Sequence, residues 1–156
     1  MTRKKTISKD LPLAEITLRR YEKPTNLSDR ELVRKLCLSL GLLQPGDSRD
    51  VIVDILYTSL RASKKRSHLT TKDIGNSVVE LRKKLNLPLV GITPPNIIRQ
   101  IRRLKGISVL EKAAEGYRIT EFSKLHDIFE EKIENLMLAS INSRIKDYLK
   151  KIDNEF

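Results

Sequence analysis

A helix bounded by prolines and a glycine is the feature that most constrains this chain. Residues 92–106 read ITPPNIIRQIRRLKG. Proline suits the first turn of a helix, where its missing N–H would be unpaired anyway, and a residue before proline stays extended. We therefore expect a helix that starts at Pro95 and ends where Gly106 supplies a left-handed stop.

The two faces of this helix differ in chemistry. Apolar residues recur with helical spacing and predict a buried face: Ile97, Ile98, Ile101 and Leu104. The opposite face carries only amides and guanidinium groups, with Arg102 and Lys105 on its flanks: Asn96, Arg99, Gln100 and Arg103. Arginine suits the edge of guanine, and asparagine and glutamine suit adenine. The pattern predicts a helix that reads the major groove of DNA, and a solvated basic face is the simpler alternative.

The distribution of charge favours the first interpretation. The chain of 156 residues has a formal net charge of +11. Residues 61–106, which contain the candidate reading helix, hold 12 Lys and Arg against 2 Asp and Glu. A concentrated positive charge of this kind is typical of proteins with a polyanionic partner.

Other features of the composition exclude several classes. There is no apolar run long enough to span a membrane, and the start MTRKKTISKD lacks the apolar region of a secretory signal. Cys37 is the single cysteine, so neither an intrachain disulfide nor a cysteine zinc site can form within one chain. We expect a cytoplasmic, nucleoid-associated protein without a membrane partner. Because aromatic residues make up only 4% of the chain, its core should be aliphatic.

Three helices are predicted before the reading helix. Residues 1–10 form a basic arm, and residues 11–24 a strand or an extended strap. A capping box of Ser28 and Glu31 begins a helix over residues 27–41. A second helix over about residues 48–62 follows a cap at Asp47 or Ser48, and Thr70 or Thr71 caps a third. The third helix has one apolar stripe: Ile74, Val78, Leu81 and Leu85.

The period of the pattern changes after the reading helix. Residues 107–112 and 117–120 read as two strands joined by the turn Ala113-Ala114-Glu115-Gly116, which predicts a β-hairpin. Thr120 can cap a final long helix over about residues 121–152. This helix has a first apolar stripe from Phe122 to Leu136. A second stripe has the spacing of a heptad seam: Leu138, Ile141, Ile145, Tyr148 and Ile152.

This order of elements resembles the winged helix-turn-helix fold. The likeness is carried by DVIVDILYTSL, TTKDIGNSVVELRKKL, ITPPNIIRQIRRLKG and ISVLEKAAEGYRIT, within residues 48–120. The expected fold is mainly α with a small β-hairpin: a winged helix-turn-helix domain (48–120), preceded by an arm, strap and helix (1–47) and followed by a long C-terminal helix (121–156). The resemblance implies base contacts from the third helix of the domain and backbone or minor-groove contacts from Lys112 and Arg118 in the wing. The sequence departs from this pattern in two ways. Its second helix is one turn longer than usual, and the connection over residues 86–93 is longer than the usual short turn.

Sequence-specific binding of double-stranded DNA by a transcriptional regulator is the predicted function. Base readout falls to Asn96, Arg99, Gln100 and Arg103 with Arg102 and Lys105 beside them, and phosphate contact to the basic loop Lys64, Lys65 and Arg66. Alternatives are a winged-helix assembly module of a transcription or chromosome complex, and RNA binding, which the low aromatic content disfavours. We expect no enzyme and no cofactor, because the sequence lacks a Gly-rich phosphate loop, a metal-ligand cluster and a nucleophile beside a base.

The final helix predicts a homodimer. It is longer than a winged domain of this size needs for its own core, and its second stripe would be left uncovered. A partner copy can bury that stripe by two-fold symmetry. The alternative is a helix that folds back onto residues 11–42 of its own chain.

Overall fold

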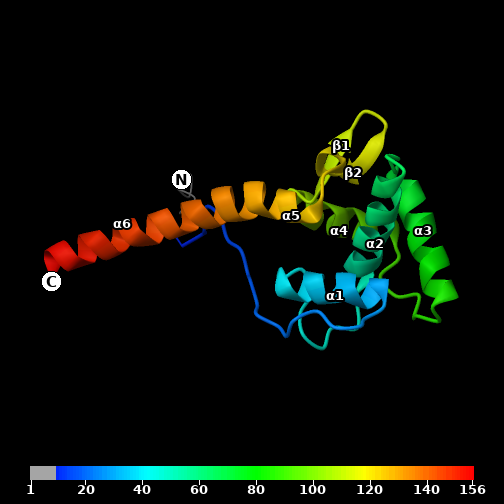
Figure 1. Cartoon of the computed structure of the whole chain (residues 1–156), viewed down its shortest axis with the longest axis horizontal. Coiled ribbons are helices and arrows are strands. Elements are labelled where there is room, and N and C mark those ends of the chain that lie inside the picture. Colours follow the sequence, from blue (N-terminus) through cyan, green and yellow to red (C-terminus); the bar gives the residue numbers. More distant parts are fainter. Residues whose placement is uncertain (1–9) are drawn as a thin grey trace, which may run out of the picture.

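The computed structural model describes residues 10–156, and Figure 1 shows four helices and a hairpin beside one long projecting helix. The first part comprises α1 (Asp29–Ser39), α2 (Val51–Lys64), α3 (Thr71–Lys84), α4 (Pro94–Gly106), β1 (Leu110–Ala113) and β2 (Gly116–Ile119). The last part comprises η1 (Thr120–Phe122), α5 (Leu125–Ile128), η2 (Phe129–Leu138) and α6 (Ala139–Glu155). The expected fold class is confirmed: the chain is mainly helical, with a small hairpin and a long C-terminal helix.

The core surrounds α2, which packs against α1, α3, α4 and β2. Five apolar residues near its start are at most 2% exposed: Val51, Ile52, Val53, Ile55 and Leu56. From α1, Val33, Cys37 and Leu38 enter the same core. Each large aliphatic side chain contributes about 1.5–3 kcal/mol when fully buried, so this aliphatic cluster stabilises the fold without tryptophan.

The connection between α2 and α3 pairs with the β2 side of the hairpin through one isolated bridge. β1 and β2 are antiparallel, with Leu110 opposite Ile119 and Lys112 opposite Tyr117. Leu69 pairs with Tyr117 through two backbone hydrogen bonds of 2.9 and 2.7 Å. Gly116 has a φ of +139°, and a Cβ there would lie 2.7 Å from the Leu69 carbonyl oxygen, so this crossing requires glycine. β1 is left as the free edge of the hairpin.

Two predicted caps are confirmed, one of them in part. Thr70 and Asp73 form a complete capping box at the start of α3. Ser28 accepts a hydrogen bond from the Glu31 backbone N–H, which is one half of the predicted box. Both helices therefore begin where a side-chain oxygen satisfies an otherwise unpaired N–H group.

Four predicted helix ends are wrong. α4 starts at Pro94, one residue early, because a proline in the first turn lacks the N–H that would be unpaired. Gly106 lies inside α4, and Ser108 takes the left-handed conformation with a φ of 64°. α2 follows Asp50 and not Asp47 or Ser48. Thr120 caps no helix, because its hydroxyl donates to the Ser108 carbonyl oxygen, and the left-handed Glu121 and Phe122 postpone the helix to Leu125.

Residues 11–24 form an extended strap, not a strand. The Arg19 backbone N–H donates to the Ser39 carbonyl oxygen at 2.8 Å, and its guanidinium donates to the carbonyl oxygens of Leu38 and Leu43. Gly41 has a φ of +69°, and a Cβ there would lie 2.6 Å from Thr17. The strap is thereby held against the C-terminal end of α1.

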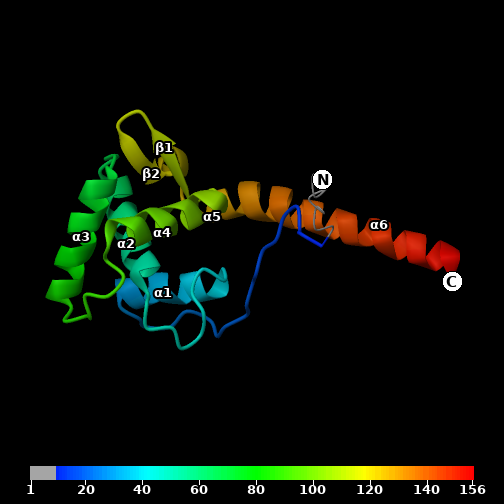
Figure 2. The ribbon, with the colours of Figure 1, turned by 180° about the vertical axis from the view of Figure 1, so that it is seen from behind.

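α5, η2 and α6 form one continuous helix that leaves the domain. Ile128, Leu138 and Ala139 at the junctions all have right-handed helical φ and ψ, and the middle part has the wider π-type winding. Its start packs on the domain through Ile128 and Ile133, which are at most 3% exposed, whereas α6 buries no residue. Figures 1 and 2 show α6 extending away from the other helices. It does not fold back onto residues 11–42. Among the described helices, none combines the length and the apolar character that a membrane crossing requires.

Candidate nucleic-acid interface

α4 presents a row of basic side chains on its exposed surface. Its buried face consists of Ile97, Ile101 and Leu104, each at most 1% exposed. Ile98, which was predicted to share that face, is 37% exposed, because only one of two adjacent helical residues can point into the core here. The exposed residues include Arg99, Arg102, Arg103 and Lys105.

The two predicted amide readers are half-buried and support the arginines. The Asn96 side-chain amide donates to the Gly91 carbonyl oxygen at 2.6 Å. Its Oδ1 accepts from Arg99 at 2.9 Å and from Gln100 at 3.2 Å, and the Gln100 Oε1 accepts from Arg103 at 3.0 Å. The amides thus hold two guanidinium groups in place on the surface of α4. Sequence reasoning placed Arg102 on a flank, whereas the structure exposes it together with Arg99.

The positive charge of α4 is not neutralised locally. Among residues 10–156, no carboxylate lies within ion-pair distance of Arg99, Arg102, Arg103 or Lys105. The first turn of α4 also contains no acidic residue. Because the guanidinium groups bond to neutral amides, they retain a full charge toward an incoming anion.

The wing has two chemically different faces. Lys112 lies opposite Tyr117, and the ammonium groups of Lys112 and Lys105 are 5.9 and 5.8 Å from the centre of the Tyr117 ring. Arg118 belongs to the other face, since side chains alternate along a strand. There it pairs with Glu111 at 2.7 Å and lies over the Phe122 ring at 4.9 Å. The two predicted wing contacts therefore do not share a surface.

The basic residues at the end of α2 and in the loop after it also differ in their surroundings. Lys64 and Lys65 are exposed at the end of α2. Arg66 is left-handed, with a φ of 51°, and its guanidinium lies 5.9 Å from the Phe122 ring. His68 meets the same ring edge to face at 5.3 Å. Lys64 and Lys65 remain available for phosphate contact, whereas Arg66 and Arg118 both lie near one aromatic ring.

A shallow basic depression lies at the free edge of β1. Its volume is about 370 Å³, and three lysines from different elements line it: Lys105, Lys112 and Lys132. Sequence reasoning missed Lys132, because it stands alone among carboxylates in the last helix. The depression continues the basic surface of α4 toward the wing.

A buried ion quartet positions the connection that leads into α4. Asp54 of α2 pairs with Arg30 of α1 at 2.8 Å and with Arg82 of α3 at 2.5 Å, and Asp50 pairs with both arginines at 3.0 Å. The Arg82 Nε–H also donates to the Pro88 carbonyl oxygen at 2.7 Å. The quartet thus ties the α3–α4 connection to α1 and α2. Asp54 inside the apolar run VIVDIL was the signal for it in the sequence.

Two members of the quartet, Asp50 and Arg30, have pKa values shifted in favour of their charged forms. Burial opposes ionisation of Asp50, but hydrogen bonds from Arg30 and Arg82 lower the pKa of its carboxyl below the ordinary value. Arg30 has a raised pKa, since the bonds to Asp54 and Asp50 outweigh its desolvation. Two guanidinium groups and two carboxylates therefore balance within the interior.

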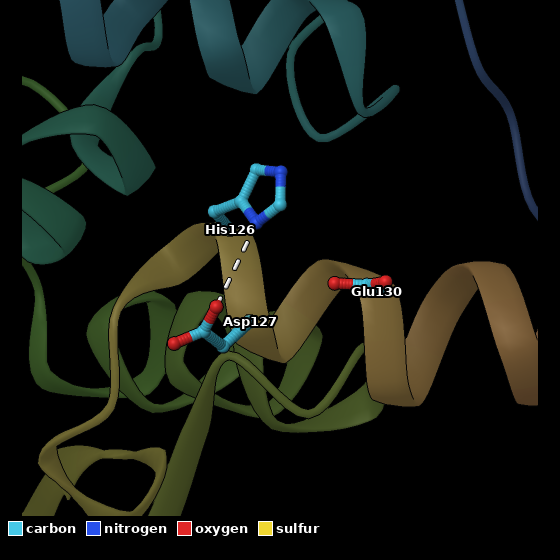
Figure 3. Close-up of side chains that lie close together, drawn as sticks. All are labelled: His126, Asp127 and Glu130. Atoms are coloured by element: carbon cyan, nitrogen blue, oxygen red, sulfur yellow. Dashed lines mark ion pairs between the residues drawn. The ribbon is translucent and has the colours of Figure 1, made fainter.

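Neither Cys37 nor the histidines form a reactive centre among the described residues. Burial raises the pKa of the Cys37 thiol to about 12, so the thiolate that would act as nucleophile is absent near neutral pH. Within residues 10–156, one group of side chains has metal-ligand chemistry: His126, Asp127 and Glu130 (Figure 3). In this group His126 Nδ1 is 3.6 Å from an Asp127 carboxylate oxygen. All three side chains are exposed, and nothing else in their surroundings indicates an ion.

Comparisons with protein-family models, with curated proteins and with solved structures found no match to this chain.

Proposed function

We propose that this protein binds double-stranded DNA with α4 in the major groove and acts as a transcriptional regulator. One observation carries the proposal: α4 exposes Arg99, Arg102 and Arg103 with no carboxylate partner in the described chain. Exposed guanidinium groups on a helix held by a rigid core can form bidentate bonds with guanine. The excess of positive charge in residues 61–106 supports the same partner.

The exposed residues divide into base and phosphate contacts. Arg99, Arg102 and Arg103 read base edges, while Asn96 and Gln100 hold them in position. Ile98, exposed beside them, suits the methyl group of thymine. Phosphate contact falls to four exposed lysines: Lys64, Lys65, Lys105 and Lys112.

A homodimer is part of this proposal. Four large apolar side chains of α6 are at least 51% exposed: Ile145, Tyr148, Leu149 and Ile152. A partner copy would bury them and would present two copies of α4 to one duplex. Two-fold symmetry then requires a palindromic site whose halves are about 34 Å apart, or a multiple of that spacing.

Selection of bound duplexes from a random library tests the proposal directly. We expect enrichment of a palindrome that contains guanine in each half. The matched control is a chain in which all three α4 arginines are replaced by alanine, which should retain the fold and lose the enriched motif. No enrichment and no binding at low salt would instead favour the assembly module, and enrichment from an RNA pool alone would favour RNA binding.

A further inference from the structure

We infer that α6 of a second copy of this chain lies in the apolar groove between α1 and the start of the last helix, with the two long helices antiparallel. The inference rests on the homodimer in the proposed function and specifies its geometry. The alternative geometry for the same homodimer is a parallel coiled coil of the two α6 helices.

The groove is an apolar cavity with an open side. Its volume is about 430 Å³. The strap, α1 and the last helix all contribute to it, chiefly through Leu18, Leu36, Leu40, Leu125, Phe129 and Ile133. Its lining residues place it between α1 and the start of the last helix, and the ribbons of these two elements carry the labels α1 and α5 in Figure 1. A long apolar helix face is the kind of ligand that such a groove accepts.

α6 of the same chain cannot fill this groove. The helix is continuous through η2, so α6 continues outward from the groove instead of turning back across it. Its apolar side chains stay exposed, with Ile145 at 51%, Tyr148 at 65% and Ile152 at 51%. Within residues 10–156 of one chain, both the groove and this helix face are left uncovered, and the two can meet only between two copies.

One set of apolar residues on the last helix is arranged symmetrically about residue 139. The members before it are Leu125, Phe129, Ile133 and Met137, and the members after it are Ile141, Ile145, Tyr148 and Ile152. Each member of the first set matches one of the second at an equal sequence distance from residue 139, to within about one residue. Two copies related by a two-fold axis near residue 139 would therefore place Ile152 of one beside Leu125 of the other. Tyr148 would likewise meet Phe129.

The charges of the two halves are complementary in the same register. Residues 125–138 carry four carboxylates and one lysine, whereas residues 139–152 carry four cations and one carboxylate. An antiparallel pair places each acidic half beside a basic half of the partner. A parallel pair would place four cations beside four cations, which disfavours it.

This complementarity identifies the occupant as a second copy. An unrelated partner would have no reason to match both the spacing and the charge of this helix. The symmetric arrangement fills two equivalent grooves at once, which is a closed isologous contact.

Distances between single labels test the geometry on the full chain. Cys37 is fully buried, with a pKa raised to about 12, so a cysteine introduced on the surface is the reactive thiol. Spin labels at Lys151→Cys should lie about 36 Å apart or further in the antiparallel dimer, from the rise of about 1.5 Å per residue. Labels at Ala139→Cys, near the axis, should lie within about 20 Å. Short distances at both positions would show a parallel pair and overturn the inference.

Sedimentation separates this inference from the proposal of DNA binding. The full chain should be a dimer at tens of micromolar, Ile145→Asp should be a monomer, and Ser143→Asp on the same helix should remain a dimer. A monomeric wild-type chain would refute the docking, and so would an Ile145→Asp variant that dimerises like wild type. Duplex binding measured on the same samples shows independently whether the proposed function survives.

Discussion

The guanidinium of Arg82 on α3 donates to the carboxylate of Asp54 on α2 at 2.5 Å, with side chains that are 1% and 0% exposed. Arg30 of α1 bonds to the same carboxylate at 2.8 Å from its other side. Asp54 thus links α2 to both α1 and α3. The hydrogen bond from Arg82 to the Pro88 carbonyl oxygen extends this link to the connection before α4. The position of the candidate reading helix depends on a charge balance in the interior.

Replacing Arg82 with methionine should destabilise the fold strongly. The substitution leaves Asp54 and Asp50 buried with one guanidinium for two charges, and breaking a buried pair in this way costs about 3–5 kcal/mol. Lys83→Met, at the exposed neighbouring position, should change the free energy of unfolding by less than about 0.5 kcal/mol. Urea denaturation measures both values, and equal midpoints for the two variants would contradict a structural role of the quartet.

The quartet should also make the fold sensitive to acid. The pKa of Asp50 is lowered in the folded state, so its ion pairs contribute stability that is complete above the ordinary value of 3.8. This contribution is lost as the pH falls through the lowered folded value. The free energy of unfolding of the wild type should therefore decrease from about pH 4 downward. In Asp50→Asn this decrease should be shallower, by at most about 1.4 kcal/mol per pH unit, and an unchanged slope would count against the assignment.

Duplex binding should depend steeply on salt. If about 5–8 phosphates are neutralised by one bound domain, log K should fall against log salt with a slope of roughly −4 to −7. Fluorescence anisotropy with a labelled duplex at several salt concentrations measures it. A slope near zero would mean that the uncompensated charge of α4 does not face phosphate.

Alanine substitutions of the proposed base-reading residues and of the proposed phosphate-binding residues should affect duplex binding differently. Arg99→Ala, Arg102→Ala and Arg103→Ala should each cost about 1–3 kcal/mol on the selected site and relax its sequence preference. Lys64→Ala and Lys65→Ala should weaken all duplexes about equally. If the arginine variants select the same motif as wild type, another element reads the bases.

The two basic residues of the wing should not behave alike. Lys112→Ala should weaken duplex binding and reduce the magnitude of the salt slope by about one, because its ammonium group is free of carboxylates in the described chain. Arg118→Ala should leave the slope nearly unchanged, because Glu111 already neutralises the guanidinium. Comparison of the two salt titrations checks this, and a larger change for Arg118→Ala would place DNA on the opposite face of the hairpin.

The sequence predicted those features that depend on residues close together along the chain. Thr70 and Asp73 cap α3, because both partners of the box lie within one turn. Ile97, Ile101 and Leu104 are buried, because their spacing places them on one side of a helix. The hairpin follows from the change of period after Gly106.

Features that depend on distant partners could not be predicted from the sequence. Asp50 stands at the start of α2, but its carboxylate bonds to Arg30 and Arg82, which lie far away along the chain. The division of the wing into a free and a neutralised face depends on the Glu111–Arg118 pair across two strands. Asn96 became a support for the arginines through its bond to the Gly91 carbonyl oxygen, a contact that depends on the path of the connection before α4.

The origin of Arg30 in α1 limits how the part of this chain that contains α4 can be transplanted. A graft that begins at residue 48 would contain α2, α3, α4 and the hairpin. It would nevertheless carry Asp50 and Asp54 into a new host without Arg30, which leaves Arg82 as their counter-ion. A graft that begins before α1 carries an electrically neutral set. α1 therefore belongs to the same structural unit as α2 and α3, and recombination between residues 30 and 54 would separate charges that the interior requires together.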